Sequence, residues 1–186
     1  MNVAVITDST SYIPQTIRNE MNIHMIPLSV VFGTQSYQEE TDITTEEFYK
    51  KVKENEQLPK TSQPSIGLIT EKLKELAVKG FDQAIFITLS SGISGTFQSV
   101  VTAETIVEGI EVHPFDSEIS CMAQGFYVLE AAEMAAQGHD AEPIIQRLHA
   151  IKASMRAVFM ADDLTHLHRG GPIKWYTGIN WQYAPG

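Results

Sequence analysis

Polar loops that directly follow apolar runs are the parts of this sequence best placed to do chemistry. The loop at residues 90–96, SSGISGT, follows the apolar run 83–89 and precedes a helical stripe. Its glycines allow a tight turn and a close approach of a ligand, and its hydroxyls and free backbone N–H groups are donors for an anion. Because the loop holds no Lys or Arg, it favours one modest negative charge, such as a carboxylate, over a triphosphate.

Three further polar clusters occupy comparable positions. Residues 7–10 and 116–117 each follow an apolar run, so they are expected at the carboxyl ends of strands, where open parallel sheets bind ligands. Residues 61–65 precede a helical stripe. The structural alternative stays open for the loop at 90–96, because Ser94 could simply cap a helix while Gly92 makes the turn.

Short apolar runs alternate with amphipathic stripes along the chain. This alternation predicts an α/β fold, a parallel β-sheet covered by helices on both faces. The segments at 33–41 and 58–65 are expected to be connections without strands. Strands are expected at residues 2–7, 23–32, 83–89, 111–115 and 157–160, and helices are expected to begin near Pro14, Thr44, Ser65, Phe97, Ile119 and Pro143.

Other nucleotide-binding and hydrolase motifs fail on spacing. A P-loop requires a lysine that the loop at 90–96 lacks, and no Gly-x-Gly-x-x-Gly is present. The segment Gly92-Ile93-Ser94-Gly95 places its second glycine one residue too early for the hydrolase elbow Gly-x-Ser-x-Gly.

No catalytic residue, metal ligand or cofactor is predicted. His113 and His139 have no recognisable partner and are expected to be exposed, and none of the four polar loops holds a histidine. Residues 162–168 contain two Asp and two His, which resemble a metal site only weakly and are expected to be solvated. Cys121 lies near a helix start and is expected to be a small packing residue.

Composition excludes several classes of partner. The chain has 186 residues, with 13 basic and 23 acidic residues and a net charge of −10. This balance argues against binding to nucleic acid or to an anionic membrane surface. The single cysteine excludes an internal disulfide and agrees with a cytoplasmic location. The longest apolar stretch, at residues 25–32, is too short to span a membrane.

At these loops the sequence resembles the DegV family of bacterial fatty-acid-binding proteins. The resemblance implies two domains, with a long-chain, palmitate-like fatty acid between them. It also implies a carrier that performs no chemistry itself and presents the acyl carboxylate to a separate fatty-acid kinase. The matching segments, in order, are residues 7–10, 61–65, 90–96, 116–117 and 162–171.

The same resemblance implies which residues hold the ligand. The family's carboxylate-binding hydroxyls fall on Thr61 and Ser94, with Ser62, Gly95 and Thr96 as neighbours. Thr61 and Ser94 are therefore expected to face one polar cleft. Ala and Met residues of the helix at 119–136 could help to line the slot for the acyl tail, although ordinary core packing is the more common role for each of these methionines.

The sequence departs from the family's pattern near its end. Pro172 stands where the family usually has arginine, and the following residues match no familiar pattern. We expect a DegV-like domain over 1–155, and at 156–186 the start of a truncated second domain with an atypical tail from about 172. Two alternatives stay open: a binding-impaired form kept folded by self-association as a homo-oligomer, and a phosphotransfer enzyme of related fold.

Overall fold

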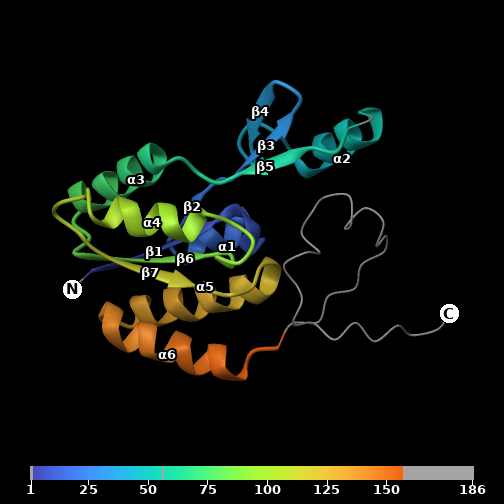
Figure 1. The fold of residues 1–186 in the computed structure, drawn as a ribbon. Coiled ribbons are helices and arrows are strands. Elements are labelled where there is room, and N and C mark those ends of the chain that lie inside the picture. The colour runs from blue at the N-terminus through green and yellow to red at the C-terminus, as the bar shows by residue number, and fades with distance from the viewer. Residues whose placement is uncertain (1, 56, 157–186) are drawn as a thin grey trace. The chain divides into compact units, whose positions relative to one another are not determined.

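The structure is a computed structural model and describes residues 2–55 and 57–156 (Figure 1). These residues belong to one compact unit that ends at Arg156. The strand expected at 157–160 therefore lies outside the described residues. Among the helices of the described part, none has the length and apolar character needed to cross a membrane.

A parallel four-stranded sheet, here called the main sheet, forms the centre of the unit. Its strand order is β2-β1-β6-β7, and each neighbouring pair is parallel. From β1 the chain first adds β2 on one side, and it then returns to add β6 and β7 on the other side. Because all four strands are parallel, their carboxyl ends lie at the same edge of the sheet. The strands are β1 (Val3–Asp8), β2 (Ile23–Ile26), β6 (Gln83–Thr88) and β7 (Glu111–Asp116).

Helices cover both faces of the main sheet, as the hydrophobic pattern predicts. Alternate residues of β1 point to opposite faces: Ile6 packs with α3 and α4, whereas Val5 packs with α5 and α6. In Figure 1, α3 and α4 lie on one side of the strands and α5 and α6 on the other. The helices are α1 (Gln15–Glu20), α3 (Ile66–Val78), α4 (Thr96–Glu104), α5 (Cys121–Ala136) and α6 (Ala141–Ser154).

A second sheet, here called the small sheet, corrects three expectations. It is antiparallel with the order β4-β3-β5, and α2 (Thr45–Glu54) packs on its apolar residues Val30 and Phe32. The segment expected as one strand at 23–32 is divided between the two sheets, and both expected connections contain a strand. The strands are β3 (Ser29–Phe32), β4 (Gln35–Gln38) and β5 (Lys60–Ser62).

Pro27 explains why the apolar run from 23 to 32 does not form one strand. Proline has no N–H to donate to a neighbouring strand, and β2, the edge strand of the main sheet, ends at Ile26, directly before it. The next residue, Leu28, finds its partners outside both sheets: its N–H donates to Ser9 Oγ at 3.0 Å, and its carbonyl accepts from Glu39 N at 2.9 Å.

Two helix starts form as the sequence predicts. Thr44 and Glu47 make the reciprocal capping box of α2, in which Glu47 N donates to Thr44 Oγ1 and Thr44 N donates to Glu47 Oε2. Ser65 caps α3 by accepting from Leu68 N at 3.2 Å. The second cap holds the end of the 61–65 segment in place.

Replacing Leu73 with alanine should destabilise the domain by about 2–5 kcal/mol, because it leaves a cavity between α3 and the main sheet. Leu73 is completely buried in that core. Val78→Ala is the control in the same helix, since Val78 is 89% exposed. Urea unfolding monitored by circular dichroism should place the Val78→Ala variant within about 0.5 kcal/mol of the parent chain. Equal effects of the two substitutions would contradict the assignment of the core face.

Candidate functional site

The carboxyl end of β1 is organised by the buried side chain of Asp8. One carboxylate oxygen accepts from Leu89 N at 2.8 Å, at the end of β6. The other accepts from Thr10 N at 3.0 Å, from Thr10 Oγ1 at 2.6 Å and from Gln124 Nε2 at 3.1 Å. Asp8 therefore joins β1, β6 and α5 at the edge of the sheet where ligands bind in this class of fold.

Burial is the main influence on the ionisation of Asp8. Removal from water raises the pKa of its carboxyl above the ordinary 3.8, although the hydrogen bonds from Thr10, Leu89 and Gln124 oppose that shift. Gln124 also donates to Thr7 Oγ1 at 3.2 Å, and its Oε1 lies 2.7 Å from Thr10 Oγ1. These partners lie in the turn after β1, at the end of β6 and on α5, so the group joins those segments.

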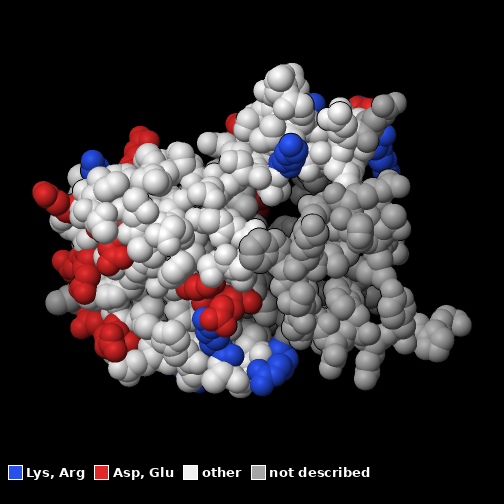
Figure 2. Space-filling model, in the orientation of Figure 1, with Lys and Arg blue, Asp and Glu red and all other residues white. Residues whose placement is uncertain are grey.

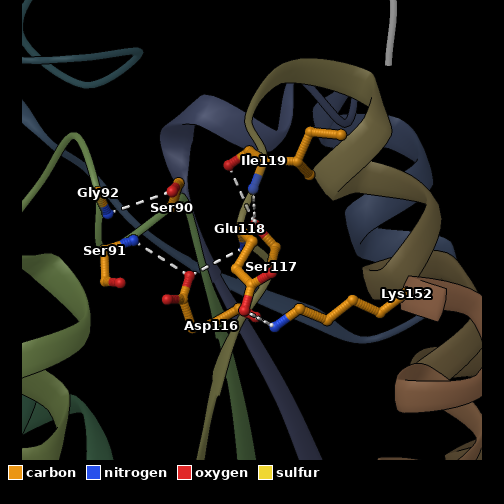
Figure 3. A network of polar contacts seen from close by, with 8 residues as sticks. All are labelled: Ser90, Ser91, Gly92, Asp116, Ser117, Glu118, Ile119 and Lys152. Atoms are coloured by element: carbon orange, nitrogen blue, oxygen red, sulfur yellow. Dashed lines mark hydrogen bonds and ion pairs between the residues drawn. The ribbon is translucent and has the colours of Figure 1, made fainter. Parts of the chain in front are cut away.

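A second carboxylate fastens the loop after β6 to the loop after β7 (Figure 3). Asp116 Oδ1 accepts from Ser91 N at 3.1 Å and from Glu118 N at 2.9 Å. Lys152 donates to the Asp116 carbonyl at 2.8 Å and pairs with Glu118 at 2.7 Å. Ser90 N donates to Ile119 O at 2.8 Å, so the first residues of the 90–96 loop are held from two sides.

Ser94, Gly95 and Thr96 are adjacent at the start of α4. Ser94 Oγ lies 2.9 Å from Thr96 Oγ1 and accepts from Thr96 N at 3.2 Å. Gly95 occupies the N-cap position and supplies no side chain to cap the helix. Thr96 is fully buried, whereas Ser94 is half-buried. The hydroxyls of Ser94 and Thr96 are thus engaged with each other, and a ligand at Ser94 would meet a hydroxyl already held in position.

Thr61 and Ser62 lie on the other sheet. Both are exposed residues of β5, where Thr61 is opposite Val30 of β3. Ser62 Oγ donates to the Gln63 carbonyl at 3.3 Å. The five residues predicted to bind the ligand are thus divided between the two sheets. Ser94, Gly95 and Thr96 lie beyond the carboxyl end of β6 in the main sheet. Thr61 and Ser62 lie on the small sheet.

A cavity of about 370 Å³ adjoins Thr61. Its apolar walls come mainly from β3 and α2, including Val30, Ile43 and Phe48, and Tyr49 lies beside them. Glu39 also lines it, and burial raises the pKa of that carboxyl above its ordinary 4.5. The cavity therefore combines an apolar wall with a hydroxyl and with a carboxyl that holds its proton more tightly than a solvated one.

The alanines of α5 line a different cavity. Ala132 and Ala135 border a space of about 440 Å³ together with Asn2 and Val3. Those two residues lie at the beginning of β1, so this cavity is at the amino ends of the strands, opposite the polar loops. Met134 packs against the core beside α6. Core packing thus accounts for the Met134 side chain.

The remaining candidate residues show no site in the described part of the chain. His113 is half-buried, contrary to expectation, and its Nε2 lies 3.4 Å from Glu111 Oε1, whereas His139 is exposed as expected. Cys121 is half-buried at the first residue of α5. Residues 162–168, with their two Asp and two His, lie outside the described range. Within that range, no three His, Cys, Asp or Glu residues are grouped as a metal ion would require.

Two glutamines at this edge were not predicted from the sequence. Gln124 is fully buried at the centre of the Asp8 group, and Gln63 donates from Nε2 to Ser99 Oγ at 2.8 Å. A signal for Gln124 was available, because it is an amide residue in a mainly apolar stretch, residues 121–129, of a helix rich in Ala and Met. Such a residue on a buried face requires a polar partner.

Replacing Asp8 with asparagine should change how stability depends on pH. Because the native pKa of Asp8 is raised, its contribution to stability is fully present below pH 3.8 and falls as pH rises through the native pKa. The free energy of unfolding of the parent minus that of Asp8→Asn should therefore decrease with pH above about 3.8 and then level off. Urea unfolding from pH 3.5 to 7 measures this difference.

Glu47→Gln is a control of opposite sign. Hydrogen bonds from Thr44 N and Oγ1 lower the pKa of Glu47 below 4.5, so its contribution is present above that pH and is lost as pH falls. The free energy of unfolding of the parent minus that of the variant should rise with pH for Glu47→Gln, whereas it should fall with pH for Asp8→Asn. A difference for Asp8→Asn that does not vary with pH would contradict the raised pKa.

Comparison with known sequences places this arrangement in a family. A family model described as "Uncharacterised protein, DegV family" matches residues 2–179. The protein DegV of Bacillus subtilis is 53% identical over 174 residues, which cover 93% of this chain and 62% of that protein. The chain therefore spans somewhat less than two thirds of the length of this curated relative.

Solved structures agree with the sequence comparison. The crystal structure of DegV from Bacillus subtilis, described as a fatty acid binding protein, superimposes with a TM-score of 0.88 at 53% identity and covers 92% of this chain and 61% of that one. A DegV lipid binding protein from Thermotoga maritima gives 0.84 at 30% identity, with 92% and 62% covered.

A stearic acid-binding protein from Eubacterium ventriosum gives a TM-score of 0.83 at 26% identity, with 91% of this chain and 59% of that one covered. The order β2-β1-β6-β7, the polar loops at the carboxyl ends of its strands and the match over residues 2–179 lead to one assignment. This chain belongs to the DegV family.

Proposed function

We propose that this protein binds a long-chain, palmitate-like fatty acid without covalent chemistry. The observation that carries the proposal is the likeness, at 53% identity and a TM-score of 0.88, to a structure described as a fatty acid binding protein. The likeness to a structure described as stearic acid-binding supports a long acyl chain. This chain covers about 60% of the length of these proteins. Its ligand is therefore inferred from theirs.

The carboxylate-binding group in this proposal consists of Thr61 and Ser94, with Ser62, Gly95 and Thr96 beside them. Hydroxyls and backbone N–H groups suit a single carboxylate, which needs a few donors and no full positive charge. Ser94 supports this role because its hydroxyl is already oriented by Thr96. Thr61 supports it because it adjoins a cavity whose apolar wall could receive part of the tail.

The surface charge fits an uncharged tail better than a polyanion. The chain carries a net charge of −10. On the face drawn in Figure 2, the described residues over α4 are mostly uncharged, and Lys and Arg do not gather into a stripe. A polyphosphate or a nucleic acid would need such a stripe, so a fatty acid, whose mass is mostly hydrocarbon, is the more suitable ligand.

The proposal extends to the protein's part in a larger system. The protein acts as a cytoplasmic carrier that presents the acyl carboxylate to a separate fatty-acid kinase, and it performs no catalysis. Residues 156–186 begin a second domain in this proposal, with an atypical tail from about 172. The four polar loops support a carrier, since they contain no histidine to accept a phosphoryl group.

Isothermal titration with palmitate tests the binding site. Thr61→Val and Ser94→Ala should each weaken binding roughly tenfold or more, because each removes a hydrogen bond to a charged group. Thr102→Val is the matched control, since its hydroxyl donates to the Gln98 carbonyl on the exposed side of α4. The control should bind as the parent does.

Two outcomes of this titration would contradict the proposal. The first is the absence of palmitate binding by the parent chain, and the second is equal weakening by Thr102→Val and Thr61→Val. Adding ATP and Mg²⁺ separates a carrier from a phosphotransfer enzyme. Mass spectrometry should then recover the palmitate unmodified, whereas acyl phosphate or its hydroxylamine adduct would indicate catalysis by the chain itself.

We also propose that the chain self-associates through Tyr12 and Tyr49. Both side chains line the cavity beside Thr61, yet they are 61% and 59% exposed. Tyrosine is enriched at protein–protein interfaces, where its ring buries a large area. Sedimentation velocity at tens of micromolar should show a species larger than a monomer, and the double variant Tyr12→Asn, Tyr49→Ser should shift it to the monomer. Val78→Ser is the control, and a monomeric parent would refute this part.

A further inference from the structure

The two candidate carboxylate-binding hydroxyls belong to different sheets, so something must hold their loops at a fixed separation. Thr61 is on β5 of the small sheet, and Ser94 follows β6 of the main sheet. At one end of the small sheet, Ser9 Oγ donates to Glu39 Oε2 at 2.5 Å and Arg18 pairs with Glu40 at 2.6 Å. Neither of these contacts involves β5 or the loop at 90–96.

Gln63 makes the connection between those two segments. It follows β5 directly, two residues after Thr61, and its Nε2 donates to Ser99 Oγ at 2.8 Å. Ser99 is buried in the first turns of α4, with 4% of its surface exposed. The residue Gln63 as a whole is exposed, so its amide end reaches from the surface of the small sheet to the helix that begins beside Ser94.

Gly95 provides the space in which the Gln63 amide lies. A Cβ atom on residue 95 would overlap Gln63 Oε1 and would lie 2.9 Å from Gln63 Cδ and 3.1 Å from Nε2. These three atoms are the nearest to that position, and all belong to Gln63. The backbone of Gly95 has φ of −79°, which any residue can adopt. The requirement for glycine here is therefore the room for Gln63.

The backbone of Gln63 is also constrained, because the residue that follows it is a proline. Pro64 is buried, and a residue that precedes proline is restricted to extended conformations. Ser65 then caps α3. The direction of the Gln63 side chain is thus set from its own backbone as well as by its contact with α4.

We propose that Gln63 is a positioning residue for the ligand: through Ser99 and the gap at Gly95, it holds the strand that carries Thr61 against the loop that carries Ser94. This inference rests on the proposed fatty-acid site and deepens it. Gln63 does not touch the ligand in this proposal. Its amide sets the separation of the two hydroxyls that share the carboxylate.

A double-mutant cycle on palmitate affinity tests the inference. Gln63→Ala and Gly95→Ala should each weaken binding about fivefold to tenfold, the first by removing the amide and the second by displacing it. The double variant should bind no more weakly than Gln63→Ala alone, because the alanine at 95 then has nothing to displace. Ser99→Ala, which removes the partner and leaves Gln63 intact, should weaken binding to a similar extent.

Matched controls separate this effect from general damage to the fold. Gly67→Ala introduces the same methyl group where only Ser65 Oγ, at 3.9 Å, is near, and Gln98→Ala removes an exposed glutamine from α4. Both should bind as the parent does. All variants should melt within a few degrees of the parent, because the atoms that Gly95→Ala displaces are the end of a flexible side chain.

Each other outcome decides against the proposal. Additive losses in the double variant would mean that Gly95 acts on the ligand directly, and unchanged affinity in Gln63→Ala would remove the positioning role. A parent chain that binds no palmitate would overturn the proposed function and this role together. NMR amide chemical shifts recorded without ligand would still report on the contact between Gln63 and the start of α4. Gln63→Ala and Gly95→Ala should shift the Ser94 and Thr96 amide signals alike. Unshifted amide signals would refute this contact.

Discussion

The relative position of β1, the end of β6 and α5 depends on one buried carboxylate. Asp8 is inaccessible to water, and a charge in such a place is stable only if hydrogen bonds replace its hydration. Those bonds come from the end of β6, from the turn after β1 and from α5. The requirement to satisfy Asp8 therefore fixes three separate segments relative to one another, and the same turn places Ser9 against the small sheet.

The polar loops and the apolar cavity make different contributions to binding in the proposed function. Each hydrogen bond to a charged carboxylate contributes about 1.5–3 kcal/mol, and the acidic chain opposes an anion at long range. Burial of a hydrocarbon tail contributes about 0.8 kcal/mol for each CH₂ group. For a palmitate-length ligand the tail supplies most of the affinity, and the hydroxyls of Thr61 and Ser94 select the end and the orientation.

The main sheet could be predicted from the sequence because its central strands β1 and β6 are largely apolar and buried on both faces. In the run at 83–89 the residues from Ala84 to Phe86 are all apolar, and β6 is fully buried. The small sheet could not be predicted this way. Its strands β4 and β5, with sequences QSYQ and KTS, are short and largely exposed, so they carry no hydrophobic alternation.

The residues of the site were predicted by resemblance to a family, but the hydrogen bonds that connect them to the rest of the fold were not. Asp8 and Gln124 are 116 positions apart, and Gln63 and Ser99 are 36 apart, so no local spacing indicates either contact.

The separation of Asp8 from its partners along the chain has a consequence for the order of folding. The small sheet uses only residues between 29 and 62, and the pairing of its strands closes short loops. The contact of Asp8 with Leu89 closes a loop of 81 residues, and the contact with Gln124 spans 116. Closure of a long loop costs more entropy than closure of a short one. On a ribosome, the N-terminal half emerges first. The small sheet can therefore be complete while Asp8 is still hydrated, and the hydrogen bonds to Asp8 are complete only after α5 has been synthesised.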